Sequence, residues 1–188
     1  MIRLATVALL ITLTGCTSVL TAARDTPIKD NRGTRTLGSS IDDQLIETKV
    51  SVNVNKAHPD IESQGRISVT SYNAVVLLAG QLPRQELIAV AGEAAKNTQK
   101  VKVVHNELTA SPPLSLLALN QDALITTNLK TRMLTAGNIP GSRIKVVTVA
   151  GVVYLMGLVT QNEASLAVAQ AQQIGGVQRI VKLFEYID

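Results

Sequence analysis

The feature that most restricts the possible folds is an internal duplication. The apolar run Val75–Gly80 recurs as Val152–Gly157, 77 residues later. One such block can arise by chance, whereas four blocks in the same order indicate duplication with short insertions in loops. The other blocks lie at offsets between 76 and 79 residues: Asp43, Leu45, Ile46 and Thr48 match Asp122, Leu124, Ile125 and Thr127; Glu86 and Ala91 match Glu163 and Val168; and Val101, Val104 and Leu108 match Val177, Ile180 and Phe184.

Both copies predict the same order of elements: a helix, an alternating strand, a tight turn, the apolar strand, a second helix and a last strand. We therefore predict an α+β fold of two tandem units, in each of which two helices cover one face of a three-stranded mixed sheet. Asp42 and Asp43 are interpreted as a cap and as first-turn charges of the first helix. The expected ranges are 42–52 and 122–135 for the first helices, 73–74 and 150–151 for the turns, and 101–108 and 177–186 for the last strands.

Composition excludes two broad classes of protein. With 46% hydrophobic and 17% charged residues, the chain can bury an aliphatic core, which argues against intrinsic disorder. Only 2% of the residues are aromatic and the net charge is +4. Binding of single-stranded nucleic acid depends on aromatic stacking, and duplex binding needs a basic stripe, so we expect no nucleic-acid partner.

The amino terminus has the pattern of an export signal. Arg3 precedes the apolar stretch Leu4–Leu13, which is about half the roughly 20 residues that a transmembrane helix needs. The stretch ends in Leu13-Thr14-Gly15-Cys16, which resembles the lipobox of bacterial lipoproteins. Cys16 is the only cysteine, so it has no partner for an internal disulfide. We expect cleavage before Cys16 and lipidation of its sulfur; the alternative is an ordinary signal peptide that contains a cysteine.

These features divide the chain into five predicted parts. Thr17 is not the Asp that is associated, by resemblance to Gram-negative lipoproteins, with retention in the inner membrane, which favours the periplasmic face of the outer membrane. The polar segment that follows is interpreted as a tether. The parts are a signal peptide (1–15), a lipidated end and tether (16–39), a first unit (40–110), a linker that contains Pro112-Pro113 (111–119), and a second unit (120–188).

The sequence offers no constellation for catalysis. His58 and His105 are the only histidines, they share no ligand spacing, and Cys16 is assigned to the lipid. A lone histidine is usually a surface or satisfied side chain. We therefore predict no catalytic residues, no metal site and no cofactor, and expect a protein that is not an enzyme.

Charge separates the two units. Residues 40–110 have a net charge of −1 and residues 114–188 a net charge of +2, so only the second unit is attracted to an anionic surface. On its first helix, a predicted buried stripe of Ile125, Leu129 and Met133 leaves Leu124 and Leu134 toward the other side. Leucines beside a lysine and hydroxyl groups suit a lipid interface. The alternative is that these leucines pack against the first unit or a loop, and the residues alone do not decide between the two.

The repeated pattern resembles the BON domain family (bacterial OsmY and nodulation). Its marks here are the apolar strand that ends in Gly, the following Glu and Ala-rich helix, and the Val-x-x-Val of the last strand. Asn106 fits the family pattern, whereas the second copy has Lys182 in its place. With the lipobox and tether, the chain resembles outer-membrane lipoproteins that consist of two BON units, most specifically at Leu155–Thr160 and Ile125–Thr127.

This resemblance implies a function. The second unit is expected to bind anionic phospholipid through its first helix and to support outer-membrane integrity at the division site. The alternative that the resemblance allows is an adaptor for the outer-membrane protein assembly machinery or for cell-wall proteins. The family has an aromatic anchor where this chain has Leu124, so weaker binding is expected. The expected phospholipid-binding residues are Leu124, Thr127, Asn128, Lys130, Thr131 and Leu134.

Overall fold

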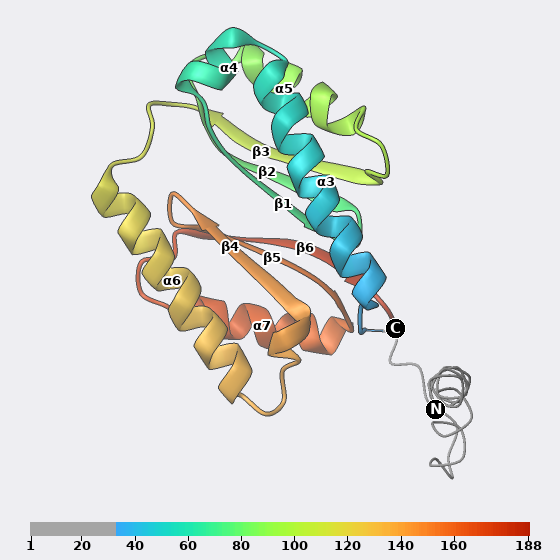
Figure 1. Ribbon diagram of the computed structural model, residues 1–188. Helices are drawn as coiled ribbons and strands as arrows, with labels where there is room; N and C mark the ends of the chain where they lie inside the picture. The colour runs from blue at the N-terminus through green and yellow to red at the C-terminus, as the bar shows by residue number, and fades with distance from the viewer. Residues whose placement is uncertain (1–32) are drawn as a thin grey trace, which may run out of the picture. The chain divides into compact units, whose positions relative to one another are not determined.

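The computed structural model describes residues 33–188, so the predicted signal peptide, Cys16 and most of the predicted tether lie outside the described residues. The predicted α+β class and the repeated order of elements are confirmed, with one additional short helix in the first unit (Figure 1). The first unit comprises α3 (Leu37–Lys56), α4 (Pro59–Gln64), β1 (Arg66–Tyr72), β2 (Val75–Leu82), α5 (Glu86–Lys96) and β3 (Val103–Ala110); the second comprises α6 (Leu116–Thr135), the 3-10 turn η2 (Gly141–Arg143), β4 (Ile144–Val149), β5 (Val152–Val159), α7 (Gln161–Gln172) and β6 (Arg179–Tyr186).

Each unit contains a three-stranded mixed sheet, as predicted. The apolar strand is central: β2 pairs antiparallel with β1 and parallel with β3, and β5 pairs in the same way with β4 and β6. The turns lie where the sequence placed them. Asn73 and Ala74, like Ala150 and Gly151, have positive φ angles between 52° and 72°. Two such residues in succession form the tight hairpin turn that matches the twist of the strands.

The first helices begin earlier than predicted. The side chain of Thr36 accepts a hydrogen bond from the Ser39 amide, and Ser115 does the same for Ala118, so these hydroxyls cap the two helices. Helix α3 therefore starts at Leu37, inside the predicted tether, and α6 starts at Leu116, inside the predicted linker. The domain boundaries remain predictions, but the helix starts at residues 42 and 122 were wrong.

The predicted capping role of Asp43 is also wrong. Asp43 lies in the second turn of α3, 3% exposed, and its carboxylate accepts hydrogen bonds from the amides of Asn73 and Ala74, at 2.9 Å each. Asp122 in α6 accepts bonds of 2.7 and 2.8 Å from the amides of the equivalent turn. In both units a helix carboxylate therefore fastens the first helix to the hairpin turn.

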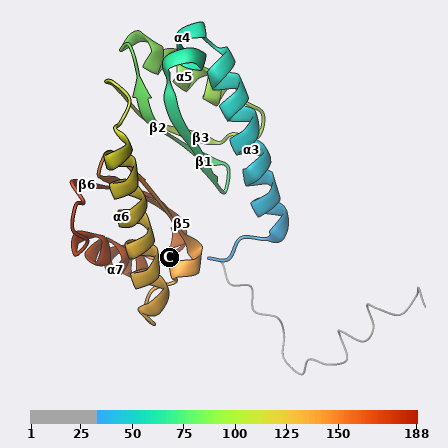
Figure 2. The same cartoon turned by 60° about the vertical axis from the view of Figure 1, so that its left-hand side comes forward.

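Two separate cores lie between the helices and the sheets. Val76 and Leu78 of β2 point toward α3 and α5, where Ile46, Val50 and Leu87 are buried. The predicted stripe of α6 is confirmed: Ile125, Leu129 and Met133 are 2%, 0% and 1% exposed and pack in the core of the second unit. Figure 2 shows α6 and α7 with the second sheet and α3 and α5 with the first.

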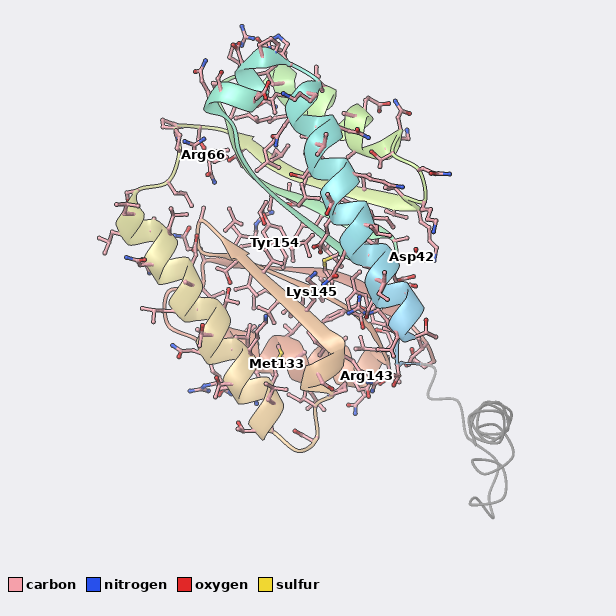
Figure 3. All side chains as sticks on the ribbon, viewed as in Figure 1. Asp42, Arg66, Met133, Arg143, Lys145 and Tyr154 are labelled. Carbon is pink, nitrogen blue, oxygen red and sulfur yellow. The ribbon has the colours of Figure 1, made fainter. Side chains whose placement is uncertain are left out.

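A third apolar cluster joins the two sheets by the faces that the helices leave uncovered. Residues of β2 alternate, so that Leu77 and Ala79 face the second unit while their neighbours face the helices. Tyr154 and Met156 of β5 meet them, and Figure 3 shows Tyr154 between the sheets. Burial on both faces explains why the central strand of each unit is a continuous apolar run.

Polar contacts reinforce this junction. The Tyr72 hydroxyl donates to the Arg143 carbonyl at 2.7 Å, and the Lys145 ammonium lies 2.6 Å from the Glu47 carboxylate. The guanidinium of Arg35 stacks 3.8 Å above the Tyr72 ring. Contacts of this kind fix the register of two apolar faces that could otherwise slide.

Candidate functional site

The predicted lipid-binding residues lie on one side of α6. Helix α6 buries Asp122, Ile125, Leu129 and Met133 along one stripe, in contact with the sheet and α7. A helix places residues three and four apart on one side, so the remaining residues face outward. All six predicted residues are exposed, namely Leu124, Thr127, Asn128, Lys130, Thr131 and Leu134. We call this set the α6 face.

The two leucines of the α6 face do not pack against the first unit or a loop. Leu124 and Leu134 are each 63% exposed. The alternative that these leucines are buried against the first unit or a loop is therefore wrong. Their exposure leaves apolar surface at two points along the helix, with Thr127 and Thr131 between them.

Sequence reasoning missed part of the exposed apolar surface of α6. The first turn contains Leu116, Leu117 and Leu119, all of which are at least half exposed. The predicted helix begins at residue 122, so these three leucines fall in the predicted linker. The available signal was Ser115, a residue type favoured at helix caps, directly before the leucines.

The charge of the α6 face is entirely basic. The only carboxylate of the helix, Asp122, is buried and bound to the turn amides. Arg132 donates to the Gln173 side chain at 3.0 Å, and within residues 33–188 Lys130 has no carboxylate partner. An exposed surface of this composition attracts phosphate groups and carries no charge that would repel them.

Burial and hydrogen bonding act in opposite directions on Asp43. Burial alone raises the pKa of its carboxyl group, since it penalises the charged form. Hydrogen bonds from Ala74, Ser71 and Asn73, together with the guanidinium of Arg35, outweigh burial and hold the pKa of Asp43 below its ordinary value. The group therefore stays ionised as a structural acceptor, which is not the behaviour of a catalytic acid.

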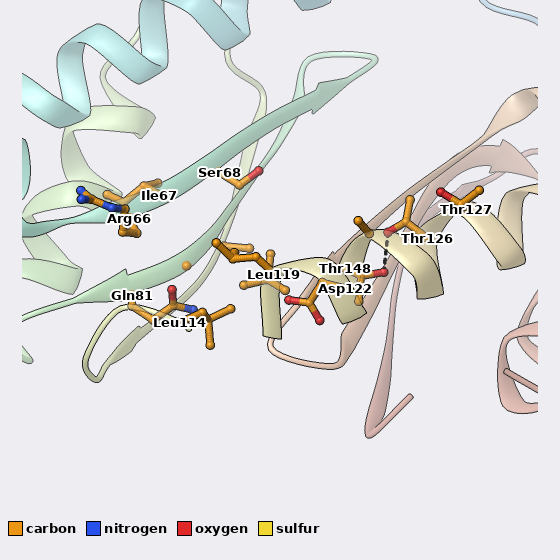
Figure 4. Close-up of a pocket in the computed structure, with 14 residues that line it drawn as sticks. Arg66, Ile67, Ser68, Gln81, Leu114, Leu119, Asp122, Thr126, Thr127 and Thr148 are labelled. Carbon is orange, nitrogen blue, oxygen red and sulfur yellow. Dashed lines mark hydrogen bonds between the residues drawn. The ribbon is translucent and has the colours of Figure 1, made fainter. Parts of the chain in front are cut away.

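A cavity of about 520 Å³ lies beside the α6 face (Figure 4). One wall comes from β1 and β2, including Ser68 and Ala79, and the other from α6 and β4, including Leu119 and Thr126. Thr126 donates to Thr148 at 2.7 Å, so part of this wall is internally satisfied. The lining combines apolar and hydroxyl side chains with Arg66, Gln81 and Asp122. The Asp122 carboxylate is already bound to the amides of the hairpin turn.

The described residues offer no metal centre and no membrane span. In residues 33–188, no group of three or more His, Cys, Asp or Glu side chains could hold an ion. His58 caps α4, because its Nδ1 accepts a hydrogen bond from the Asp60 amide at 3.1 Å. Over the same range, none of the helices has the length and apolar character needed to traverse a bilayer.

Comparisons with known proteins agree with the duplication. The BON domain family matches residues 42–112 and again residues 121–188. The chain is 36% identical over 176 residues to "Outer membrane lipoprotein DolP" of Haemophilus influenzae, covering 94% of this chain and 91% of that protein. It is 29% identical to the "21 kDa hemolysin" of Actinobacillus pleuropneumoniae, with 81% and 78% covered, and 29% identical to "Osmotically-inducible protein Y" of Escherichia coli, with 77% and 72% covered. The first similarity supports an outer-membrane lipoprotein with two such domains.

Proposed function

The chain belongs to the BON domain family, and on that premise we propose that it is a non-enzymatic lipoprotein, anchored by Cys16 to the periplasmic face of the outer membrane, whose α6 face binds anionic phospholipid. In this proposal the bound protein supports the integrity of the outer membrane at the division site. The observation that carries the proposal is the composition of the α6 face: exposed leucines, hydroxyl groups and Lys130, on a helix whose only carboxylate is buried.

The binding free energies expected for these side chains predict a membrane contact that is weak by itself and effective when the chain carries its lipid anchor. Leucine burial contributes roughly 1.5–3 kcal/mol when complete, and a lysine near an anionic membrane contributes about 1 kcal/mol. Leu124, Leu134 and Lys130 would together give a modest affinity. A lipid anchor converts such binding into an intramolecular event at high effective concentration, so the α6 face need not hold the protein on the membrane by itself.

Cosedimentation with vesicles tests the α6 face. The mature chain with Cys16→Ser, which has no lipid, should bind phosphatidylglycerol vesicles and bind phosphatidylcholine vesicles much less. Leu124→Glu should reduce binding at least tenfold, because it removes an insertion point and adds repulsion. Gln172→Glu, an exposed position on α7, is the matched control and should bind nearly as the parent does.

Two outcomes would contradict this site. Equal binding to both kinds of vesicle would remove the role of lipid charge, and unchanged binding of Leu124→Glu would remove the role of α6. If vesicle binding is absent while crosslinking in cells captures one stoichiometric protein partner, the adaptor for assembly machinery or cell-wall proteins becomes the better description.

Lipidation of Cys16 is tested separately. Labelled palmitate should be incorporated into the wild-type chain and not into Cys16→Ser. The substituted chain should leave the outer-membrane fraction, since the described residues contain no membrane-spanning helix. Incorporation that persists in Cys16→Ser would refute the assignment of the anchor.

A further inference from the structure

Helix α3 of the first unit carries an apolar stripe that the fold leaves uncovered. Leu37, Ile41, Leu45 and Val52 are 87%, 60%, 52% and 54% exposed. Steps of four and seven residues place them along one side of the helix. The buried stripe of Ile46, Val50 and Val54 lies on the opposite side, so α3 is apolar on two sides. We call the four exposed residues the α3 stripe.

The acidic residues of α3 are neutralised by contacts within the protein. The Asp42 carboxylate lies 2.8 Å from the Lys100 ammonium, and Glu47 is paired with Lys145 of the second unit. Asp43 is buried in its contacts with the hairpin turn. An anionic surface that approaches the α3 stripe would therefore meet carboxylates whose charge is already compensated.

Cationic and neutral side chains border the stripe. Lys49 is exposed and, among residues 33–188, has no carboxylate within ion-pair distance. Gln44 and Thr48 lie at the edge of the stripe away from Lys49 and carry no charge. An exposed row of aliphatic side chains bordered by lysine and uncharged polar groups has the composition of a helix that lies in a lipid interface.

Chain connectivity brings this stripe to the membrane. The α3 stripe begins at the first residue of α3, and 20 residues separate Cys16 from Leu37. Whatever the arrangement of those residues, they can span at most about 70 Å. The N-terminal end of the stripe is therefore confined to a shell close to the bilayer that holds the acyl chains, which raises the effective lipid concentration at α3.

We propose that the α3 stripe is a second membrane-contact surface, which lies on the first unit and binds the anionic phospholipid bilayer that anchors Cys16. The inference rests on the proposed lipid anchor but not on the α6 face. The stripe inserts its leucines and isoleucine below the headgroups while Lys49 meets phosphate. Its affinity depends on the anchor, since the first unit as a whole has a net charge of −1.

Depth measurements on the lipidated full-length protein test this surface. Since Cys16 carries the lipid, a cysteine introduced by Ile41→Cys is the only reactive thiol and accepts an environment-sensitive fluorophore. In phosphatidylglycerol-containing vesicles, nitroxides on the lipid acyl chains should quench this label by about twofold or more. The control is Glu93→Cys, an exposed position on α5, which should show little quenching.

A second set of variants separates this inference from the α6 face. Quenching at residue 41 should persist in the lipidated chain that also carries Leu124→Glu, and should fall in the chain that carries Leu45→Glu. Loss of quenching with Leu124→Glu would show that α3 only follows α6 to the membrane and would overturn the inference. Absence of quenching at residue 41 while the α6 face still binds vesicles would overturn it and leave the proposed function intact. A label that is shielded by a second protein copy without lipid quenching would assign the stripe to self-association instead.

Discussion

Both units contain the same buried contact between the first helix and the hairpin turn, and this contact has more hydrogen-bond partners in the first unit. In each unit an aspartate of the first helix binds both amides of the hairpin turn between the first two strands. Asp43 also accepts bonds from the Ser71 hydroxyl at 2.7 Å and from Arg35 at 2.5 Å, whereas among residues 33–188 Asp122 accepts from the two amides alone. Duplication has therefore kept the backbone contact, while side chains around it have diverged.

The first helices of the two units, α3 and α6, also differ in how their charged side chains are paired. In the first unit every carboxylate of α3 is paired within the described chain: Asp42 with Lys100, Asp43 with Arg35 and the turn amides, and Glu47 with Lys145 of the second unit. In the second unit α6 has no exposed carboxylate, and Lys130 stands exposed among hydroxyl groups. The acidic side chains of α3 are therefore paired within the protein, whereas Lys130 of α6 has no carboxylate partner among residues 33–188.

The largest expected losses of stability come from two substitutions in β2, one in the core of the first unit and one in the junction between the units. Leu77 and Leu78 are adjacent, fully buried and on opposite faces of β2. Each change to Ala should lower the free energy of unfolding by roughly 2–5 kcal/mol in urea titrations. Hydrogen exchange should distinguish them: Leu78→Ala weakens protection in α3 and α5, and Leu77→Ala weakens it in both sheets. Identical exchange patterns would contradict the presence of two separate clusters.

The next effect compares the two aspartates. Asp43→Ala leaves two turn amides and the Arg35 guanidinium without their partner, and should cost about 3 kcal/mol or more of unfolding free energy. Asp122→Ala leaves two amides unpaired and should cost about 2 kcal/mol. Urea titrations of both variants at neutral pH measure the difference. A larger loss for Asp122→Ala would reverse the proposed ranking of the two contacts.

The contribution of Asp43 should also depend on pH. Its pKa is lower in the folded state than in the unfolded state, so its stabilisation is present above the unfolded pKa of about 3.9 and is lost as the pH falls through the folded pKa. The difference in unfolding free energy between wild type and Asp43→Asn should be constant near neutral pH and shrink below about pH 4. Asp42→Asn, which removes an exposed ion pair, is the control and should change stability by less than about 1 kcal/mol throughout.

The repeat explains why so much of the fold was predictable. Two copies of one hydrophobic pattern specified the element order, the central apolar strand and the hairpin turns, and the stripe Ile125, Leu129 and Met133 is buried as expected. The helix starts were missed because Leu37 and Leu116 are exposed and so break the amphipathic pattern. A cap residue such as Thr36 satisfies local amides and is independent of that pattern.

The features of the fold that could not be predicted depend on contacts between segments that are distant in the sequence. The role of Asp43 depends on a turn 30 residues later, and the junction of the sheets depends on which face of β2 each side chain occupies. The continuous apolar run indicated burial on both faces but not which element covers the second face. Helical spacing placed Leu124 and Leu134 away from the buried stripe of α6. The predicted start of the first helix at residue 42, in contrast, left Leu37 and Ile41 of the α3 stripe outside that helix.

Exchange of one charge between equivalent helix positions tests the difference in the outward faces. Lys130 and Ser51 lie 79 residues apart, the same offset as Leu124 and Leu45. With Cys16→Ser as background, Lys130→Ser should weaken binding to phosphatidylglycerol vesicles about fivefold, since one lysine contributes about 1 kcal/mol. Adding Ser51→Lys to that variant should restore little of the binding, because the proposed α3 contact depends on the lipid anchor. Restoration to the level of the parent would show that it does not matter which of the two helices carries the lysine.

The smallest expected effect concerns Leu124, which occupies the place of the aromatic anchor in the resemblance that the sequence shows. Tryptophan combines an apolar ring with an N–H donor and prefers the headgroup level, whereas leucine gains only from burial of its methyl groups. Leu124→Trp should therefore strengthen vesicle binding about two- to threefold. Its intrinsic fluorescence should shift to shorter wavelength on binding, with no background because the chain has no other tryptophan. Leu45→Trp at the equivalent position of α3 should show that shift only in the lipidated chain, because in our proposal the first unit reaches the bilayer through the anchor. A shift of equal size without the lipid would mean that the two first helices differ less in membrane affinity than their surrounding charges indicate.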